Sequence, residues 1–179
     1  MSDGARFRQL VLPHLDAGYN LARWLARDAQ DAEDVVQEAC LRALKYLHGL
    51  RADEARAWFL TIVRHAYYDW CQRNRPQELM GDARELLEST ADPGAIDPEQ
   101  AALRSADARL LAAAIEALPL AFREVLILRE IEEFPYRQIA QITGTPIGTV
   151  MSRLARARAL LQQAPQLREM RVEPHRGAT

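Results

Sequence analysis

Apolar residues recur at helical spacing along most of this chain, in stretches separated by proline, glycine or polar residues. The pattern predicts helical segments over residues 5–27, 31–47, 57–75, 99–117 and 119–163. Pro13 interrupts the first segment, which predicts two helices or one kinked helix. Asp31 is placed to cap the second, with Asp34 three residues later as in a capping box. We therefore expect an all-α protein.

Residues 77–98 lack this periodicity, and the segment from Glu78 to Glu99 holds seven acidic residues and one arginine. We expect a flexible acidic linker here, with a possible short helix at 83–87. The linker would join two small helical domains, residues 1–76 and 99–164, of which the second is a four-helix unit. Residues 165–179 carry no apolar stripe and are expected to form a disordered tail.

Residues 135–160 have the pattern of a helix-turn-helix. Gly144 suits the turn because glycine tolerates the left-handed conformation at a helix end. Thr145 can cap the next helix, and Pro146 suits its first turn. The second helix of such a motif normally lies in the major groove of DNA.

A helical wheel divides the residues of this second helix between two faces. The face expected to pack on the preceding helix holds Ile147, Val150, Leu154, Ala157 and Leu161. The outward face and its flanks hold Thr149, Met151, Ser152, Arg153, Ala155 and Arg156. Arg158 lies near the apolar face, where it could reach a phosphate or pair with a carboxylate. Phe134 to Leu160 contains four arginines and no acidic residue, which favours DNA binding over a plain solvated helix.

Two other helices carry polar faces with two possible interpretations each. On residues 31–47, the face opposite the predicted core holds Asp34, Gln37, Glu38 and Leu41, which is either a protein-docking patch or a solvated acidic surface. On residues 57–75, the predicted core face holds Trp58, Phe59, Ile62, Val63, Ala66 and Trp70. The other side and its edges hold Arg64, His65, Tyr67, Tyr68, Cys71 and Arg75. Arginine beside aromatic rings is typical of a single-stranded nucleic-acid platform, although half-buried tyrosines would give the same pattern.

The net charge of −2 hides a strong segregation, because Asp28 to Glu38 holds five acidic residues and no basic one. The two cysteines form no CxxC motif and the four histidines are scattered, so we expect no disulfide framework, no metal and no cofactor. No catalytic motif is present, which argues against an enzyme. No apolar run approaches a membrane span and no signal peptide is evident. We therefore expect a cytoplasmic protein without membrane insertion.

Three motifs in this order resemble the extracytoplasmic-function (ECF) group of the sigma-70 family, over roughly residues 5–163. Residues 31–44 (DAEDVVQEACLRAL) and 58–69 (WFLTIVRHAYYD) are similar to two segments of the family's region 2. Residues 118–158 are similar to region 4, most clearly at 148–153 (GTVMSR). The resemblance implies a promoter-specificity subunit of RNA polymerase without an active site of its own.

The resemblance also implies the partners and their residues. The face of Asp34, Gln37, Glu38 and Leu41 would dock on the β′ clamp helices of core RNA polymerase, and region 4 would contact the β flap. The loop at 49–56 and the helix at 57–75 would bind the melted −10 element, with Arg64, His65, Tyr68, Arg73 and Arg75 as the DNA-binding residues. Region 4 would read the duplex −35 element through Met151, Ser152, Ala155 and Arg156, with Thr149 and Arg153 on phosphates. An anti-sigma factor is implied by the same resemblance.

Two residues depart from the family pattern. His65 stands where an asparagine is usual, which changes the expected preference for the flipped −10 base, and Pro135 replaces a small polar cap. The alternative function is a stand-alone helix-turn-helix regulator with an N-terminal sensing domain. It would bind DNA tightly without polymerase, whereas a sigma factor would need core enzyme.

Overall fold

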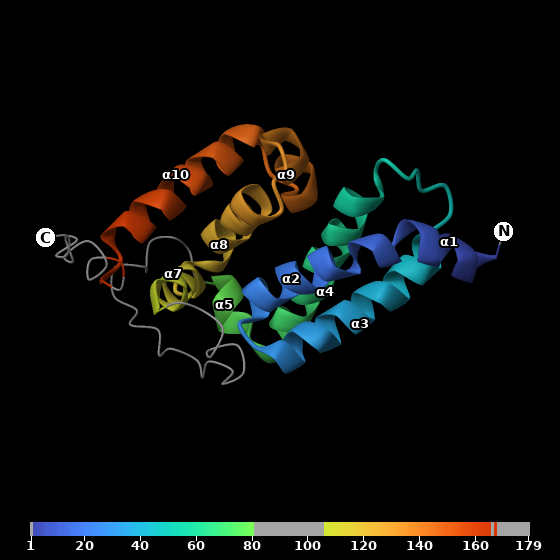
Figure 1. The fold of residues 1–179 in the computed structure, drawn as a ribbon, viewed down its shortest axis with the longest axis horizontal. Helices are drawn as coiled ribbons and strands as arrows, with labels where there is room; N and C mark the ends of the chain where they lie inside the picture. Colours follow the sequence, from blue (N-terminus) through green and yellow to red (C-terminus); the bar gives the residue numbers. More distant parts are fainter. Residues whose placement is uncertain (1, 81–105, 166, 168–179) are drawn as a thin grey trace, which may run out of the picture.

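A computed structural model describes residues 2–80, 106–165 and 167, and every regular element in those residues is helical (Figure 1). The N-terminal part contains α1 (Asp3–Leu10), η1 (Leu12–His14), α2 (Leu15–Ala26), α3 (Ala29–Tyr46), α4 (Ala55–Asn74) and α5 (Pro76–Met80). The C-terminal part contains α7 (Ala106–Glu116), α8 (Leu120–Leu126), η2 (Ile127–Ile131), α9 (Tyr136–Thr143) and α10 (Ile147–Gln163). The predicted all-α class is confirmed.

The N-terminal domain is built on the mutual packing of α2, α3 and α4. Pro13 lies in η1 and separates α1 from α2. Of the two predicted alternatives, the structure therefore has two helices and not one kinked helix. The predicted cap of α3 was wrong, because α3 begins at Ala29 and Asp28 accepts a hydrogen bond from the backbone N–H of Asp31 at 2.9 Å. The preceding Arg27 ends α2 with φ 61°, so the cap of α3 lies three residues earlier than the aspartate pattern indicated.

The buried face of α4 also differs from the prediction. Phe59, Val63 and Ala66 are buried as expected, but Trp58, Ile62 and Trp70 are only partly buried. Cys71, placed on the opposite side by the sequence pattern, and Tyr67, placed at the edge, are both fully buried. The reason is that α4 packs on α2 and α3 on one side and on α5 and α9 on others, so no single stripe defines its core face.

The C-terminal domain contains the predicted four helices, with α8 extended by a π-helical turn, η2, that the sequence pattern did not indicate. Gly144 ends α9 with φ 65°, which confirms its role in the turn. Thr145 does not cap α10: its hydroxyl lies 2.9 Å from that of Thr143, and Pro146 is the residue before the helix. Val150, Leu154 and Ala157 are buried as predicted, whereas Ile147 is 48% exposed.

The two domains pack against each other and share one continuous apolar core. Helix α4 contacts α9 and α2 contacts α8, as Figure 1 shows for the green and blue helices beside the yellow and orange ones. The predicted linker at 77–98 was wrong at its start, because α5 covers Pro76–Met80. The rest of that segment, including the short helix considered at 83–87, lies outside the described residues, as does most of the predicted tail at 165–179.

Gly18 sets the distance between α2 and α4. A Cβ atom at this position would lie 2.6 Å from Cε1 of Phe59 and 3.2 Å from Cγ2 of Val63, and both side chains are fully buried. Gly18→Ala should therefore lower the free energy of unfolding by about 1–3 kcal/mol, because overpacking outweighs the better helix propensity of alanine. Chemical denaturation measures this change. Gly4→Ala is the matched control, because nothing lies within 4 Å of its Cβ position; equal stability of the two variants would contradict the packing argument.

Candidate polymerase-binding and DNA-binding surfaces

The predicted docking residues lie together on the outer face of α3. Asp34, Gln37 and Leu41 are exposed, and Leu41 has 64% of its surface accessible. Glu38 is partly covered because Nε of Arg42 donates to its carboxylate at 2.8 Å. Arg42 also pairs with Asp69 of α4 at 2.7 Å, which ties this face to the neighbouring helix. The helix thus presents carboxylates around an exposed leucine.

Sequence reasoning missed two apolar side chains at the end of the same helix. Leu44 and Tyr46 are both exposed, and Leu44 lies beside the polar face. Leu44 follows Leu41 by three residues, and side chains at this spacing lie next to each other on a helix surface. That spacing was the available signal. The outer surface of α3 is therefore more apolar than the acidic motif indicated.

The five residues predicted for the −10 element do not form one open surface. His65 and Arg73 are exposed on α4. Arg75 is instead bound internally, donating to the backbone oxygen of Ala26 at 3.0 Å and to the carboxylate of Asp31 at 2.7 Å. In this arrangement Arg75 connects the end of α4 to the α2–α3 corner, so it is not an open contact in this structure.

Arg64 and Tyr68 are covered by the C-terminal domain. The guanidinium group of Arg64 forms an ion pair with the carboxylate of Glu124 in α8, and the hydroxyl of Tyr68 donates to Oε2 of the same residue at 3.1 Å. Arg64 also stacks on the Tyr68 ring at 4.3 Å from its centroid. Only 1% of the Glu124 side chain is exposed. Arg64 and Tyr68, two of the five residues expected to contact −10 DNA, are thus bound to Glu124 of the same chain.

The electrostatics of this cluster follow from its burial. Burial raises the pKa of the Glu124 carboxyl, and the positive charge of Arg64 acts in the opposite direction. Burial also raises the pKa of Tyr68, so its hydroxyl keeps its proton and donates. Burial first and then the charge of Arg64 lower the pKa of the nearby His65 below its usual 6.5, so this imidazole is mainly neutral at pH 7.

The predicted −35 residues lie on the free side of α10. Met151, Ser152, Ala155 and Arg156 are all exposed, and Met151 has 53% of its surface accessible. Thr149 is partly buried. Arg153 is also partly buried, and its charge lowers the pKa of both Glu124 and Tyr68, so it lies toward the interdomain cluster.

Two further residues refine the surface of α10. Arg158 donates to Glu130 at 2.5 Å, so of its two expected roles the structure supports pairing with a carboxylate. Ile147 was assigned to the packing face, but it is exposed one helical turn before Met151. Ile147 is the first residue of α10, and burial of the stripe begins only at Val150.

No group of histidine, cysteine and acidic residues in the described part of the chain is arranged to hold a metal ion. Cys40 and Cys71 are both free thiols. Among the described helices, none combines the length and the apolar character that crossing a membrane requires.

Two family models match the chain, one to each domain. The model of sigma-70 region 2 matches residues 10–77, and the model of sigma-70 region 4 matches residues 108–161. The RNA polymerase sigma-H factor of Pseudomonas aeruginosa is 34% identical over 93% of this chain and 91% of its own length. The ECF RNA polymerase sigma-E factor of Escherichia coli K12 is 34% identical over 76% of this chain and 74% of its own length.

Solved structures give the same result. The sigma factor RpoE of Bartonella quintana, in complex with the anti-sigma factor NepR, superposes with a TM-score of 0.69 at 30% identity, covering 90% of this chain and 96% of that one. CnrH, in complex with the cytosolic domain of CnrY, superposes with a TM-score of 0.60 at 26% identity, covering 88% and 85%.

The chain therefore belongs to the sigma-70 family. Within that family it is an ECF sigma factor with regions 2 and 4, a transcription initiation factor and not an enzyme. The family prediction from the three sequence motifs is confirmed, and the alternative of a stand-alone regulator with a sensing domain is set aside.

Proposed function

We propose that this sigma factor binds core RNA polymerase through the outer face of α3, at the β′ clamp helices. The supporting observation is that Asp34, Gln37 and Leu41 are exposed while the other faces of α3 pack on α2 and α4. Exposed carboxylates around a leucine suit a partner surface of arginines and apolar groups, the surface that the family resemblance implies. Leu44 extends this face, and region 4 would add a contact with the β flap.

Region 4 reads the −35 element through the N-terminal half of α10 in this proposal. Recognition helices contact base edges with their first turns, where Met151, Ser152, Ala155 and Arg156 lie. The fork of Arg156 suits the O6 and N7 atoms of guanine. Thr149 and Arg153 lie on the flanks and would bind phosphates, Arg153 after leaving the interdomain cluster.

Region 2 binds the melted −10 strand through α4, with His65 and Arg73 accessible at once and Arg64 and Tyr68 after the domains separate. A neutral His65 both donates and accepts hydrogen bonds, so it can replace an asparagine against a base edge. Arg75 would serve only if its bond to Asp31 opens.

Domain limits at 1–76, 77–98, 99–164 and 165–179 complete the proposal, supported by the family models at 10–77 and 108–161. Two of the solved structures that resemble this chain are the sigma factor RpoE bound to the anti-sigma factor NepR and CnrH bound to the cytosolic domain of CnrY. An anti-sigma factor is therefore the expected regulator, and the cytoplasm the expected compartment, because RNA polymerase works there.

The docking face is tested by reversing its charge. Asp34→Arg with Glu38→Arg should weaken association with core polymerase by about a hundredfold or more, because like charges facing each other cost several kcal/mol. A pull-down with tagged core enzyme measures this. Asp53→Arg with Glu54→Arg is the matched control, since it makes the same charge change at two exposed positions outside α3. Equal binding by both double variants would remove the docking assignment.

The −35 assignment is tested with Arg156→Ala. Run-off transcription from a −35-dependent promoter should fall by about 10- to 100-fold with core binding unchanged, because one bidentate base contact contributes ~1–3 kcal/mol of discrimination. Arg158→Ala is the control, because Arg158 lies on the same helix and pairs with Glu130. Normal output from the Arg156 variant, or an equal loss in both, would show that Arg156 is not a base reader.

Ile147 supplies a third test, because it forms an exposed apolar pair with Met151 at i and i+4. We expect this pair to contact the 5-methyl group of a −35 thymine. Replacing that thymine by deoxyuridine should weaken wild-type promoter binding about fivefold, because burying one methyl group contributes ~1 kcal/mol of binding free energy. The same replacement should have no effect on Ile147→Ala,Met151→Ala holoenzyme.

Leu111→Ala is the control for this pair, because Leu111 is an exposed apolar residue of α7 in the same domain. It should keep the full response to deoxyuridine. If the Ile147 and Met151 double variant responds like wild type at every −35 thymine, methyl contacts by this pair are excluded.

A further inference from the structure

The contact between the two domains includes, besides the shared apolar core, charged groups of both domains. Glu124 comes from α8 of region 4, and its carboxylate accepts from Arg64 and from Tyr68 at 3.1 Å, both in α4 of region 2. We propose that Glu124 is an intramolecular latch. In the free sigma factor its carboxylate binds Arg64 and Tyr68 of region 2, and these bonds must break before the two side chains can bind −10 DNA. The latch is thus an autoinhibitory contact, and its effect on DNA rests on the −10 role proposed above for Arg64 and Tyr68.

Glu124 and a DNA phosphate would use the same donor. The Arg64 guanidinium bonds the carboxylate with both Nε and Nη2, and its plane is stacked on the Tyr68 ring. A nucleotide bound at this place would need the guanidinium for its phosphate and the ring for its base. Occupation by Glu124 and by DNA is therefore mutually exclusive.

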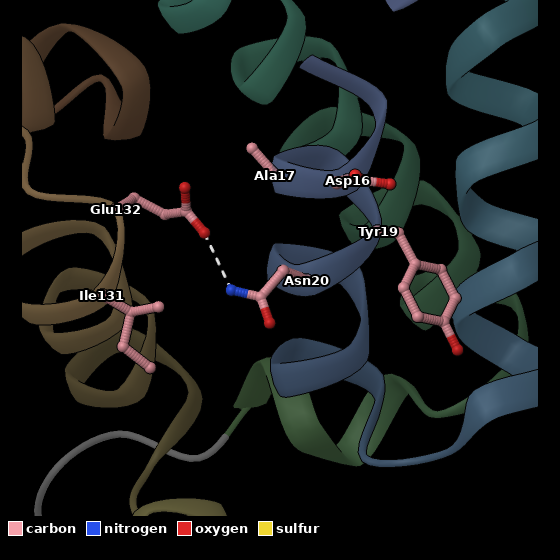
Figure 2. A pocket seen from close by; sticks show the side chains of 6 residues that line it. All are labelled: Asp16, Ala17, Tyr19, Asn20, Ile131 and Glu132. Carbon is pink, nitrogen blue, oxygen red and sulfur yellow. Dashed lines mark hydrogen bonds between the residues drawn. The ribbon is translucent and has the colours of Figure 1, made fainter. Parts of the chain in front are cut away.

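A second interdomain contact lies at the edge of the same interface. Glu132, just after η2, accepts from Arg56 of α4 at 2.8 Å and from Nδ2 of Asn20 in α2 at 2.8 Å. Arg56 also stacks on Phe134 at 4.3 Å. Figure 2 shows the Asn20–Glu132 bond across a cleft between the blue helix α2 and the brown segment around Ile131.

A third contact comes from Arg123, the residue before Glu124. Its Nη2 atom donates to the backbone oxygen of Leu25 in α2 at 3.1 Å, and its Nη1 atom donates to oxygens within region 4. Consecutive residues of α8 thus bind α2 and α4. Arg123 and Glu124 of region 4 therefore attach it to two helices of region 2, α2 and α4.

Buried ion pairs make this interface easy to switch. In the closed form each of these charges depends on partners from the other domain, whereas separation of the domains opens Arg64 and Glu124 to water. Removing one partner of a pair therefore raises the free energy of the closed form and leaves that of the open form unchanged. The outer faces of α3 and α10 are exposed in the closed form, so polymerase and duplex DNA remain able to bind before the latch opens.

The primary test measures opening of the full-length chain in solution by small-angle X-ray scattering. Glu124→Ala should shift the closed–open equilibrium at least about tenfold toward the open form, because it leaves Arg64 buried without its carboxylate. The radius of gyration should rise above the wild-type value. Glu130→Gln is the matched control: it removes an acidic charge from the adjoining η2 segment, but that charge pairs with Arg158 inside region 4. An unchanged radius for Glu124→Ala would overturn the latch.

A second variant protects the test against a folding defect. Arg56→Ala removes the edge contact to Glu132, and Arg56 is only partly buried, so region 2 should keep its helix content by circular dichroism. It should also increase the radius of gyration. If Glu124→Ala loses helix content, the Arg56 variant decides: a wild-type radius overturns the latch, and a larger one supports it.

The DNA arm uses a fluorescein-labelled, randomised 20-nucleotide single strand without core polymerase, followed by anisotropy. Glu124→Ala should bind about tenfold more tightly than wild type, and adding Arg64→Ala should remove the gain. A larger radius without tighter DNA binding would leave the latch standing and overturn the −10 role of Arg64 and Tyr68. Tighter binding that survives the Arg64 substitution would overturn that role as well.

Discussion

Helix α4 packs against α2, α3, α5 and α9, so almost every side of it must fit a neighbouring helix. The arrangement of the chain follows from this packing constraint. Phe59 and Val63 fill the space that Gly18 leaves on α2, while Tyr67 and Cys71 are buried toward α5 and the end of the domain. The remaining side presents Arg64 and Tyr68, which are too polar to be buried without partners. Region 4 supplies those partners through Glu124. The packing of α4 thus links the core of region 2 to the position of region 4.

The fold class, the order of helices and the outer faces of α3 and α10 could be predicted because they depend on local periodicity. Val150, Leu154 and Ala157 follow the helical repeat of α10, and Gly144 marks a turn that few other residues tolerate. Errors occurred where the pattern meets a helix end. Ile147 continues the stripe in sequence but lies beyond the helix that would cover it, and Asp28 caps α3 in place of Asp31.

The covering of Arg64 and Tyr68 by region 4 could not be predicted, because it depends on residues 60 positions apart. Glu124 stands among the apolar residues of α8, and in the sequence it looks like a solvated residue on the outer face of that helix. Nothing local indicates that Arg64 is its partner. The same is true of Arg56 with Glu132 and of Arg75 with Asp31. Contacts of this kind are set by how whole helices pack, which a one-dimensional pattern does not contain.

These internal pairs also explain how a DNA-binding chain can carry a net charge of −2. Many arginines of region 2 are neutralised by carboxylates within the protein, whereas Arg156 on α10 stays exposed. Electrostatic attraction to DNA is therefore concentrated at region 4 while the domains are closed. In the function proposed above, polymerase holds region 2 and duplex DNA holds region 4, so each domain would gain contacts that do not depend on the other domain. Under the proposed latch, closure of the domains would compete with these two tethered interactions, and the Arg64 side chain would become available where single-stranded DNA is formed.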